Sequence, residues 1–178
     1  DYGSLVFDNN MVDYPHLKEL YAGIIDPSYS GGKTFNIVAK NNGMFPHSIA
    51  MSPGDKISIN NSSGRPLTFF LADARDTFQD LSKVNSGETR SFIIKVQGNL
   101  ELDTDENEQF KAIILSKKGL RSQQLSSGSS YAFEKLEPGN YQMIFWFWRL
   151  GQLVRHIQIK AGKNTVVNEL LSVNTVMR

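Results

Sequence analysis

The sequence predicts an all-β protein, built as a Greek-key β-sandwich with a smaller C-terminal β-module packed on it. Short apolar segments recur along the chain, and glycine, proline, asparagine or serine bounds each of them. Short strands at such spacing are typical of sandwiches with antiparallel sheets. We expect strands at residues 34–39, 48–51, 56–60, 67–71, 90–96, 112–116, 130–133, 141–148, 153–159 and 165–173.

The chain is expected to divide into three parts. Residues 1–30 are predicted to form an N-terminal arm packed on the following domain, residues 31–117 the main sandwich, and residues 118–178 the small β-module. Within the arm a short helix is expected at residues 12–21, because Asp13 can cap it and apolar residues follow at helical spacing.

Two polar stretches interrupt the predicted strands. Residues 73–86 have room for a helical turn around residues 77–81. The stretch 122–130, rich in serine, glutamine and glycine, fits either a hinge or a long hairpin loop. The four strands beyond it would be marginal alone and would bury their apolar face more easily against the first sheet.

Composition and charge limit the possible functions. The 178 residues are enough to bury a sizeable core, and 40% hydrophobic with 21% charged residues is ordinary for a globular protein. Nineteen basic against 18 acidic residues give a net charge of +1, without the basic excess of a nucleic-acid binder. No apolar stretch is long enough to span a bilayer. We therefore expect neither a nucleic-acid partner nor a membrane span.

Residues 98–115 carry the most informative pattern: a glycine and a short strand, a six-residue turn, then an apolar strand. This pattern resembles the copper-ligating loop of blue-copper proteins, the cupredoxins, in which Cys, His and Met ligands precede such a strand. The resemblance puts Thr104 at the Cys position, Asn107 at the His position and Phe110 at the Met position.

The upstream residues 45–61 also resemble cupredoxins, with a strand, a Pro-Gly-Asp turn and a second strand ending in asparagine. In copper-binding members a Pro-His-Thr-like segment follows and supplies the first His ligand, and here Leu67 occupies that position. A type-1 copper site needs a thiolate and two imidazoles, and the chain has no cysteine. We therefore expect no copper and no other cofactor, Ca²⁺ aside.

The stretch 133–150 narrows the resemblance to exported cupredoxins of the methylamine-utilization or plastocyanin-like type. Trp146, Phe147 and Trp148 stand where those proteins read Trp-His-Pro, and Arg149 follows as their arginine does. The likeness implies a periplasmic or secreted protein. The Leu-Glu-Pro-Gly-Asn-Tyr turn within this stretch also resembles transthyretin-like or carboxypeptidase-regulatory-like modules, which are non-catalytic sandwiches.

An acidic cluster lies inside the copper-type loop. Asp103, Asp105 and Asn107 resemble the first half of an EF-hand loop, with Glu108 beside them, and oxygen ligands of this kind suit Ca²⁺. The loop lacks the glycine of the sixth position and has Ile114 at the twelfth, where the EF-hand has glutamate. A low-affinity Ca²⁺ site and a solvated acidic loop that suits a positively charged partner both remain open.

Two tryptophans mark a second candidate surface. Trp146 and Trp148 fall on one face of the predicted strand by two-residue alternation, with Phe145 and Phe147 on the other. An exposed pair would form a platform for a sugar ring or a partner protein, whereas a buried pair would be core.

No pattern indicates catalysis. His16, His47 and His156 share no ligand spacing, and no motif pairs a nucleophile with a base. The sequence therefore predicts a non-catalytic, exported binding protein on a copper-free cupredoxin scaffold, with a protein or a glycan as partner. A Ca²⁺-binding protein and a carbohydrate-binding module are the alternatives. The expected contact residues are Leu67, Asn107, Phe110, Trp146, Trp148 and Arg149.

Overall fold

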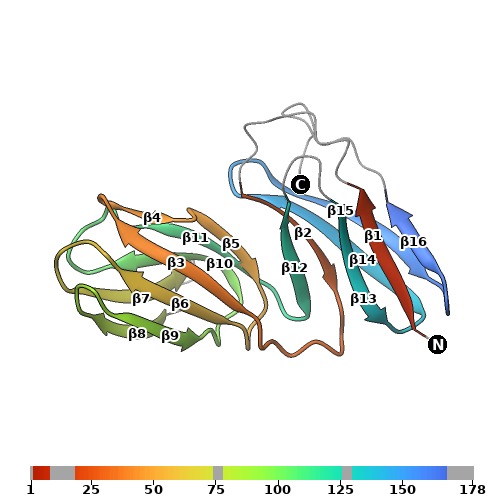
Figure 1. Ribbon diagram of the computed structural model, residues 1–178, viewed down its shortest axis with the longest axis horizontal. Helices are drawn as coiled ribbons and strands as arrows, with labels where there is room; N and C mark the ends of the chain where they lie inside the picture. The colour runs from red at the N-terminus through yellow and green to blue at the C-terminus, as the bar shows by residue number, and fades with distance from the viewer. Residues whose placement is uncertain (1, 9–18, 74–77, 126–129, 168–178) are drawn as a thin grey trace. The chain divides into compact units, whose positions relative to one another are not determined.

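The computed structural model describes residues 2–8, 19–73, 78–125 and 130–167 (Figure 1). Every named element among them is a β-strand, so the protein is all-β, as predicted. The strands form four sheets and the chain divides into two compact units. Unit 1 comprises Asp1–Asp26 and Arg121–Arg178, and unit 2 comprises Pro27–Leu120. Among the described residues, no helix has the length and apolar character that a bilayer crossing requires.

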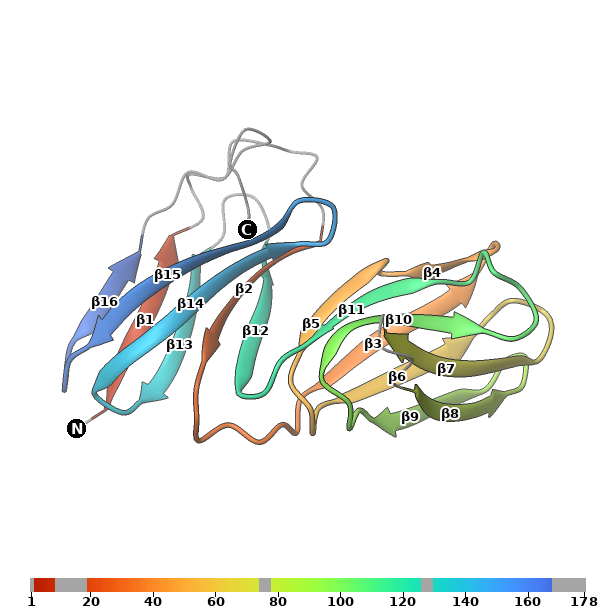
Figure 2. The ribbon, with the colours of Figure 1, turned by 180° about the vertical axis from the view of Figure 1, so that it is seen from behind.

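Unit 2 contains two sheets, whose ribbons can be followed in Figure 2. The buried side chains of their strands are mostly apolar. Its strands are β3 (Thr34–Lys40), β4 (Gly43–Phe45), β5 (Ser48–Met51), β6 (Lys56–Asn61), β7 (Leu67–Asp73), β8 (Phe78–Val84), β9 (Thr89–Ile93), β10 (Gly98–Thr104) and β11 (Ala112–Ser116). One sheet has the order β5-β11-β10-β7-β8 and the other β4-β3-β6-β9. β3 pairs with β6 and β5 with β11 in parallel, which requires crossover connections.

The core of unit 2 follows from strand alternation. In β3, β6, β7 and β10 buried residues alternate with partly or fully exposed ones, and the buried residues are apolar except Asn61 and Thr104. Ile37, Ile57, Phe69, Leu71 and Leu102 have no exposed surface. Burying both apolar faces against each other therefore fixes the pairing register, because a slip of one residue would expose them.

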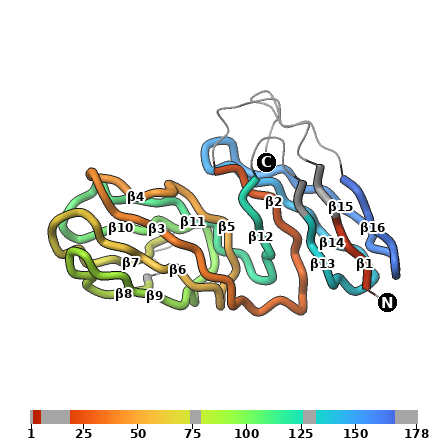
Figure 3. Tube along the Cα trace, viewed as in Figure 1, coloured from red at the N-terminus to blue at the C-terminus, as the bar shows by residue number. Residues whose placement is uncertain are grey.

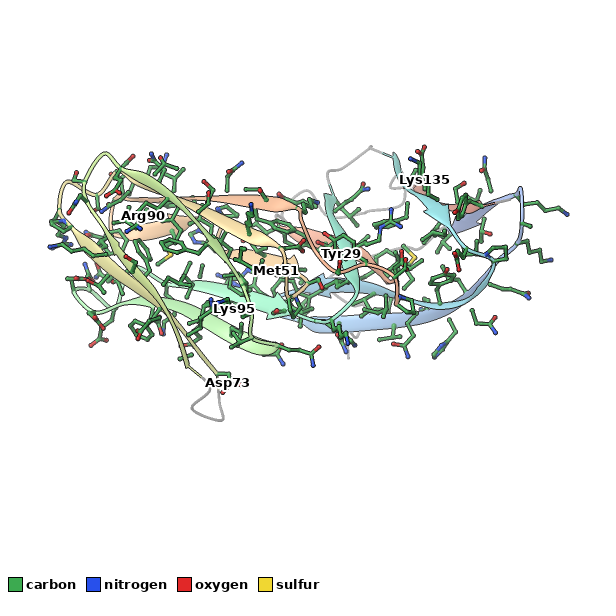
Figure 4. The ribbon with its side chains drawn as sticks, turned by 90° about the horizontal axis from the view of Figure 1, so that it is seen from below. Tyr29, Met51, Asp73, Arg90, Lys95 and Lys135 are labelled. Carbon is green, nitrogen blue, oxygen red and sulfur yellow. The ribbon has the colours of Figure 1, made fainter. Side chains whose placement is uncertain are left out.

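Two ends of unit 2 can be distinguished. β3 and β6 finish, and β7 and β11 begin, at one end, which we call the loop end: residues 40–47, 61–67, 85–88 and 104–111. The opposite end, the base, holds residues 27–33 and 52–55. Figure 4 shows the labelled Arg90 and Tyr29 toward these opposite ends of unit 2.

At the base, two glycines let two backbone segments touch. Gly31 and Gly54 have φ angles of +97° and +95°, which side chains disfavour. A Cβ atom on Gly54 would lie 2.1 Å from the carbonyl oxygen of Ser30. Next to this contact the buried carboxylate of Asp55, 1% exposed, accepts hydrogen bonds from the Tyr29 hydroxyl and the backbone N–H groups of Lys33 and Ser52.

Unit 1 also contains two sheets (Figure 3). Its strands are β1 (Gly3–Asp8), β2 (Leu20–Ile25), β12 (Leu120–Leu125), β13 (Ser130–Leu136), β14 (Gly139–Phe147), β15 (Gly151–Ile159) and β16 (Asn164–Val167). The sheet orders are β13-β1-β16 and β12-β2-β14-β15. Its core contains Leu5, Ala22, Ile24, Phe133 and Phe145, so residues from both ends of the chain build it.

The chain passes between the units only after β2 and before β12, two neighbouring strands of one sheet. Asp26 and Arg121, the residues of unit 1 at these two points, form an ion pair with 3.2 Å between Nη1 and Oδ2. The Arg121 guanidinium also donates to the backbone carbonyl of Glu134. These contacts fasten the outgoing and returning chain to each other.

The N-terminal segment differs from the predicted arm. Residues 3–8 and 20–25 are β1 and β2, each paired with strands on both sides, because Leu5, Leu20 and Ile24 supply part of the core of unit 1. The helix expected at residues 12–21 falls mostly outside the described residues, and its last residues belong to β2. The C-terminal module is thus completed by N-terminal strands, and unit 2 spans 27–120 instead of 31–117.

Three further segments are strands where none was expected. Residues 78–84 form β8 instead of a helical turn, residues 120–125 form β12, which overlaps the stretch 122–130 interpreted as a hinge or loop, and residues 43–45 form the short strand β4. All three lie at sheet edges. An edge strand is partly solvated, so the polar composition of β8 and β12 hid them from a search for apolar segments.

Candidate functional site

The loop after β10 is fastened to the start of β7. The β7–β10 register pairs Thr104 with Phe69, and the Asp105 N–H donates to the Thr68 carbonyl oxygen at 3.1 Å. The Glu106 carboxylate accepts from Thr68 twice, from its N–H at 2.8 Å and its hydroxyl at 2.7 Å. Hydrogen bonds to a charged acceptor are the stronger kind, so this loop is held in one position.

Of the four positions that the sequence resemblance aligns with copper ligands, the three in this loop are occupied by residues that close it. The Thr104 hydroxyl and the Phe110 N–H both donate to the Asn107 carbonyl oxygen, at 2.8 Å and 3.1 Å. The Asn107 side chain accepts from the Gln109 N–H at 2.9 Å. Leu67 and Phe110 are 0% and 1% exposed. Hydrocarbon and turn hydrogen bonds therefore fill these positions, and with no cysteine in the chain they do not fit type-1 copper.

The burial of Leu67 and Phe110 contradicts the prediction that these two residues contact a partner. Leu67 lies in the interior opposite Val84, and the Phe110 ring lies inside the loop with the Arg65 guanidinium carbon 5.7 Å from its centroid. Neither side chain is exposed enough to contact a partner. Both instead pack in the interior beneath the loop. Asn107, which is half-buried, acts mainly through its turn hydrogen bonds.

A neighbouring turn is built around one buried asparagine. The Asn61 amide, fully buried, donates to the carbonyl oxygens of Arg65 and Val84, both at 2.8 Å, and its oxygen accepts from the Ser63 N–H. The Arg65 guanidinium then reaches the Asn42 side-chain oxygen at 3.3 Å. Side-chain bonds therefore join three loops at this end of unit 2.

Phe45 and His47 add an exposed aromatic pair at the loop end. Their ring centroids are 4.8 Å apart, Phe45 is 39% exposed, and the Lys40 ammonium lies 5.7 Å from the Phe45 centroid. The His47 carbonyl accepts from the Ile113 N–H, which places His47 where β5 begins beside β11. The spacing of the histidines in the sequence did not single out His47. This residue directly precedes β5, the strand that pairs with β11, and β11 follows the loop after β10.

The acidic residues are not gathered around a cation site. Lys111 forms ion pairs with Glu101 at 3.2 Å and with Asp103 at 3.8 Å, while Asp105 and Glu108 are exposed. Among the described residues, no group of three or more His, Asp or Glu side chains is arranged to hold a metal ion. Burial raises the pKa of the Asp103 carboxyl, although Lys111 acts to lower it.

The two tryptophans do not form one strand face. β14 ends at Phe147, so Trp148 lies in the turn that follows, with the Arg149 guanidinium carbon 4.7 Å from its ring. Trp146 is 5% exposed and its ring lies 6.0 Å from that of Tyr21. The pair therefore forms no shared platform. His47 and His156 lie in different units, and His16 lies outside the described residues.

The Glu106–Thr68 contact predicts a pH dependence. Burial alone would raise the pKa of Glu106, yet this pKa is lowered because the Thr68 N–H and hydroxyl stabilise the carboxylate. The resulting stability is present above the ordinary glutamate pKa of about 4.3 and is lost as pH falls through the lowered value. Glu106→Gln is therefore expected to destabilise the protein near neutral pH and progressively less in acid, as measured by urea unfolding at several pH values. Glu108→Gln, which removes an exposed carboxylate, is the control and should not reproduce this trend.

Fold and site together define unit 2 as a two-sheet, cysteine-free β-sandwich with a closed loop at residues 104–110. No protein-family model matches the chain, and no curated protein matches it. Among solved structures, it is similar to amicyanin from Paracoccus versutus, with 4% identity, 53% of this chain and 91% of that chain covered, and a TM-score of 0.41.

Two further solved structures show comparable similarity. A purple cupredoxin from Nitrosopumilus maritimus is 10% identical, with 46% of this chain and 98% of that chain covered and a TM-score of 0.39. The Cu-containing nitrite reductase from Thermus scotoductus SA-01 is 13% identical, with 47% of this chain and 22% of that chain covered and a TM-score of 0.40.

Proposed function

We propose that this is a non-catalytic, exported binding protein, and that the loop end of unit 2, on a copper-free cupredoxin-like scaffold, contacts a positively charged partner protein. One observation carries the proposal. The loop 104–110 is closed by its own hydrogen bonds and fastened to Thr68, yet it presents Asp105 and Glu108 to solvent. Export rests on the sequence resemblance to exported cupredoxins.

Rigidity supports a contact role for this loop. A loop that is ordered before binding loses less conformational entropy on association than a mobile loop does. Here the hydrogen bonds of Thr104 and Glu106 and the packing of Phe110 already fix the backbone. The loop therefore serves as a preformed surface. Its own hydrogen bonds and packing hold it in shape, so it needs no metal for this.

The charges of the loop 104–110, which are all negative, support a basic partner. Lys111 is engaged by Glu101 and Asp103. Asp105 and Glu108 form no ion pair with any described residue. Exposed charges of one sign steer a complementary partner and set specificity more than affinity.

The test is a selection of random peptides displayed on phage against the immobilised full chain. We expect the selected peptides to be enriched in lysine and arginine. We also expect their affinity, measured by isothermal titration calorimetry, to fall roughly tenfold or more in Asp105→Lys/Glu108→Lys. These two side chains are exposed and accept none of the bonds that fasten the loop, so the variant should keep its melting temperature.

The matched control is Glu134→Lys/Glu137→Lys, which makes the same charge change on exposed residues of unit 1. Peptides that bind this control as tightly as wild type support the proposal. Selected peptides without a basic bias, or peptides whose affinity is unchanged in Asp105→Lys/Glu108→Lys, would refute it.

A further inference from the structure

The outer face of the sheet β4-β3-β6-β9 in unit 2 differs from the loop end in its chemistry. The register of β3, β6 and β9 aligns its outward side chains in rows across the sheet. On β3, β6 and β9, two central rows contain only uncharged residues, all but one of them polar, and together these rows run along the middle of the face. They are Asn36, Ser58 and Ser91 in one row and Val38, Asn60 and Thr89 in the next.

Charge on this face is restricted to one sign. No carboxylate occupies an outward position of β3, β4, β6 or β9, although the chain has 18 acidic residues. Lys56 stands toward the base and Lys40 toward the loop end, both exposed. Neither lysine forms an ion pair with any described residue. The face therefore has an uncharged hydrogen-bonding centre with a cation toward each end.

Exposed apolar side chains are concentrated on the same face. Only four large hydrophobic side chains are exposed in the described part of the chain, and two of them are Phe45 at 39% and Ile93 at 49%. Phe45 extends the row of Val38, and Ile93 extends the row of Lys56. They stand on the two edge strands, β4 and β9, at opposite sides of the polar rows.

We propose that this face binds an acidic glycan. A sugar ring has an apolar C–H face that packs on an aromatic or aliphatic side chain, and hydroxyl groups around its edge that exchange hydrogen bonds with hydroxyls and amides. Phe45 and Ile93 supply the apolar contacts, the two central rows supply the hydrogen bonds, and the lysines pair with carboxylates of the glycan. The Asn60 amide already donates to the Thr89 hydroxyl at 2.8 Å, so these groups are oriented before binding.

Other ligand classes fit this face less well. A protein interface has an apolar or aromatic centre with a polar rim, whereas here the centre is polar and the apolar side chains are at the edges. Nucleic acid requires several phosphate contacts from basic residues, and this face has two lysines. The surface is separate from Asp105 and Glu108, so its test does not depend on the proposed protein contact.

The experiment measures binding of alginate oligosaccharides to the full chain by isothermal titration calorimetry, with dextran oligosaccharides as the neutral probe. We expect saturable binding of alginate, at least roughly tenfold tighter than that of dextran. Ser91→Asp, which places a carboxylate in a central row, and Lys56→Glu should each weaken alginate binding roughly tenfold or more. Both side chains are exposed, and unchanged melting temperatures would confirm that the variants fold.

The control is Lys118→Glu, the same charge reversal at an exposed lysine away from this face. Retained affinity in this variant supports a site on the β4-β3-β6-β9 sheet. Absence of alginate binding, equal binding of dextran, or equal losses in Lys56→Glu and Lys118→Glu would each overturn the proposal.

Discussion

Asp55→Ala is expected to lower the free energy of unfolding by about 3–5 kcal/mol. The Asp55 carboxylate, 1% exposed, accepts three hydrogen bonds, from the Tyr29 hydroxyl and from the N–H groups of Lys33 and Ser52. Alanine would remove the acceptor that these three donors share, at a place where Gly31 and Gly54 hold two backbone segments in contact. The Ser52 N–H is buried, and the loss of a hydrogen-bond partner is costly for a buried donor.

Urea unfolding followed by two signals measures this loss. Both tryptophans lie in unit 1, so tryptophan fluorescence reports on unit 1, whereas far-UV circular dichroism reports on the strands of both units. A circular dichroism transition that shifts without the fluorescence transition therefore reports on unit 2. Tyr29→Phe is the matched control, because it removes one of the three bonds and should cost about 1 kcal/mol. An Asp55→Ala variant that loses no more stability than Tyr29→Phe would show that the carboxylate does not hold the base together.

The second large effect is a gain of metal binding. Leu67→His, Thr104→Cys, Asn107→His and Phe110→Met combined would place two imidazoles, a thiolate and a thioether at the four positions that the sequence resemblance aligns with copper ligands. These are the ligands of a blue-copper site. We expect this quadruple variant to bind Cu²⁺ with an intense blue absorption band that wild type, which lacks cysteine, does not show.

One control variant makes this result specific. The triple variant that keeps Leu67 lacks one imidazole and should lose the blue band while keeping the fold by circular dichroism. A folded quadruple variant that gives no thiolate–copper absorption would argue against the cupredoxin-like scaffold in the proposed function. The peptide-binding test of Asp105 and Glu108 is separate, because it needs no copper.

Local pattern was a good guide to the strands of unit 2. The strands at residues 48–51 and 112–116 have the predicted bounds, because each is a short apolar segment between turn residues. Prediction was poorest at residues 1–30, where β1 and β2 pair with strands from the far end of the chain. Such pairing depends on long-range contacts that no local pattern records.

At the candidate site, too, the sequence predicted local features but not contacts that depend on strand register. Sequence alignment with the copper loop located Thr104 and Asn107 in one turn, and their hydrogen bonds confirm that they are close. It also placed Leu67 among the contact residues, but strand alternation in β7 turns that side chain into the core. The role of Thr68 as the anchor for Glu106 depends on the register of β7 and β10, which the sequence does not state.

The position of the two chain crossings has a consequence for how this protein can vary. Because β2 and β12 are neighbours in one sheet, residues 27–120 are a guest domain inserted into the connection between two strands of a host domain. The Asp26–Arg121 pair closes the host at the point of insertion. Insertions of this kind are tolerated when the ends of the guest are close together. Another domain with adjacent termini could therefore be grafted between β2 and β12. A ligand that changes the distance between the two ends of the guest domain would also change the spacing of these two strands in the host sheet.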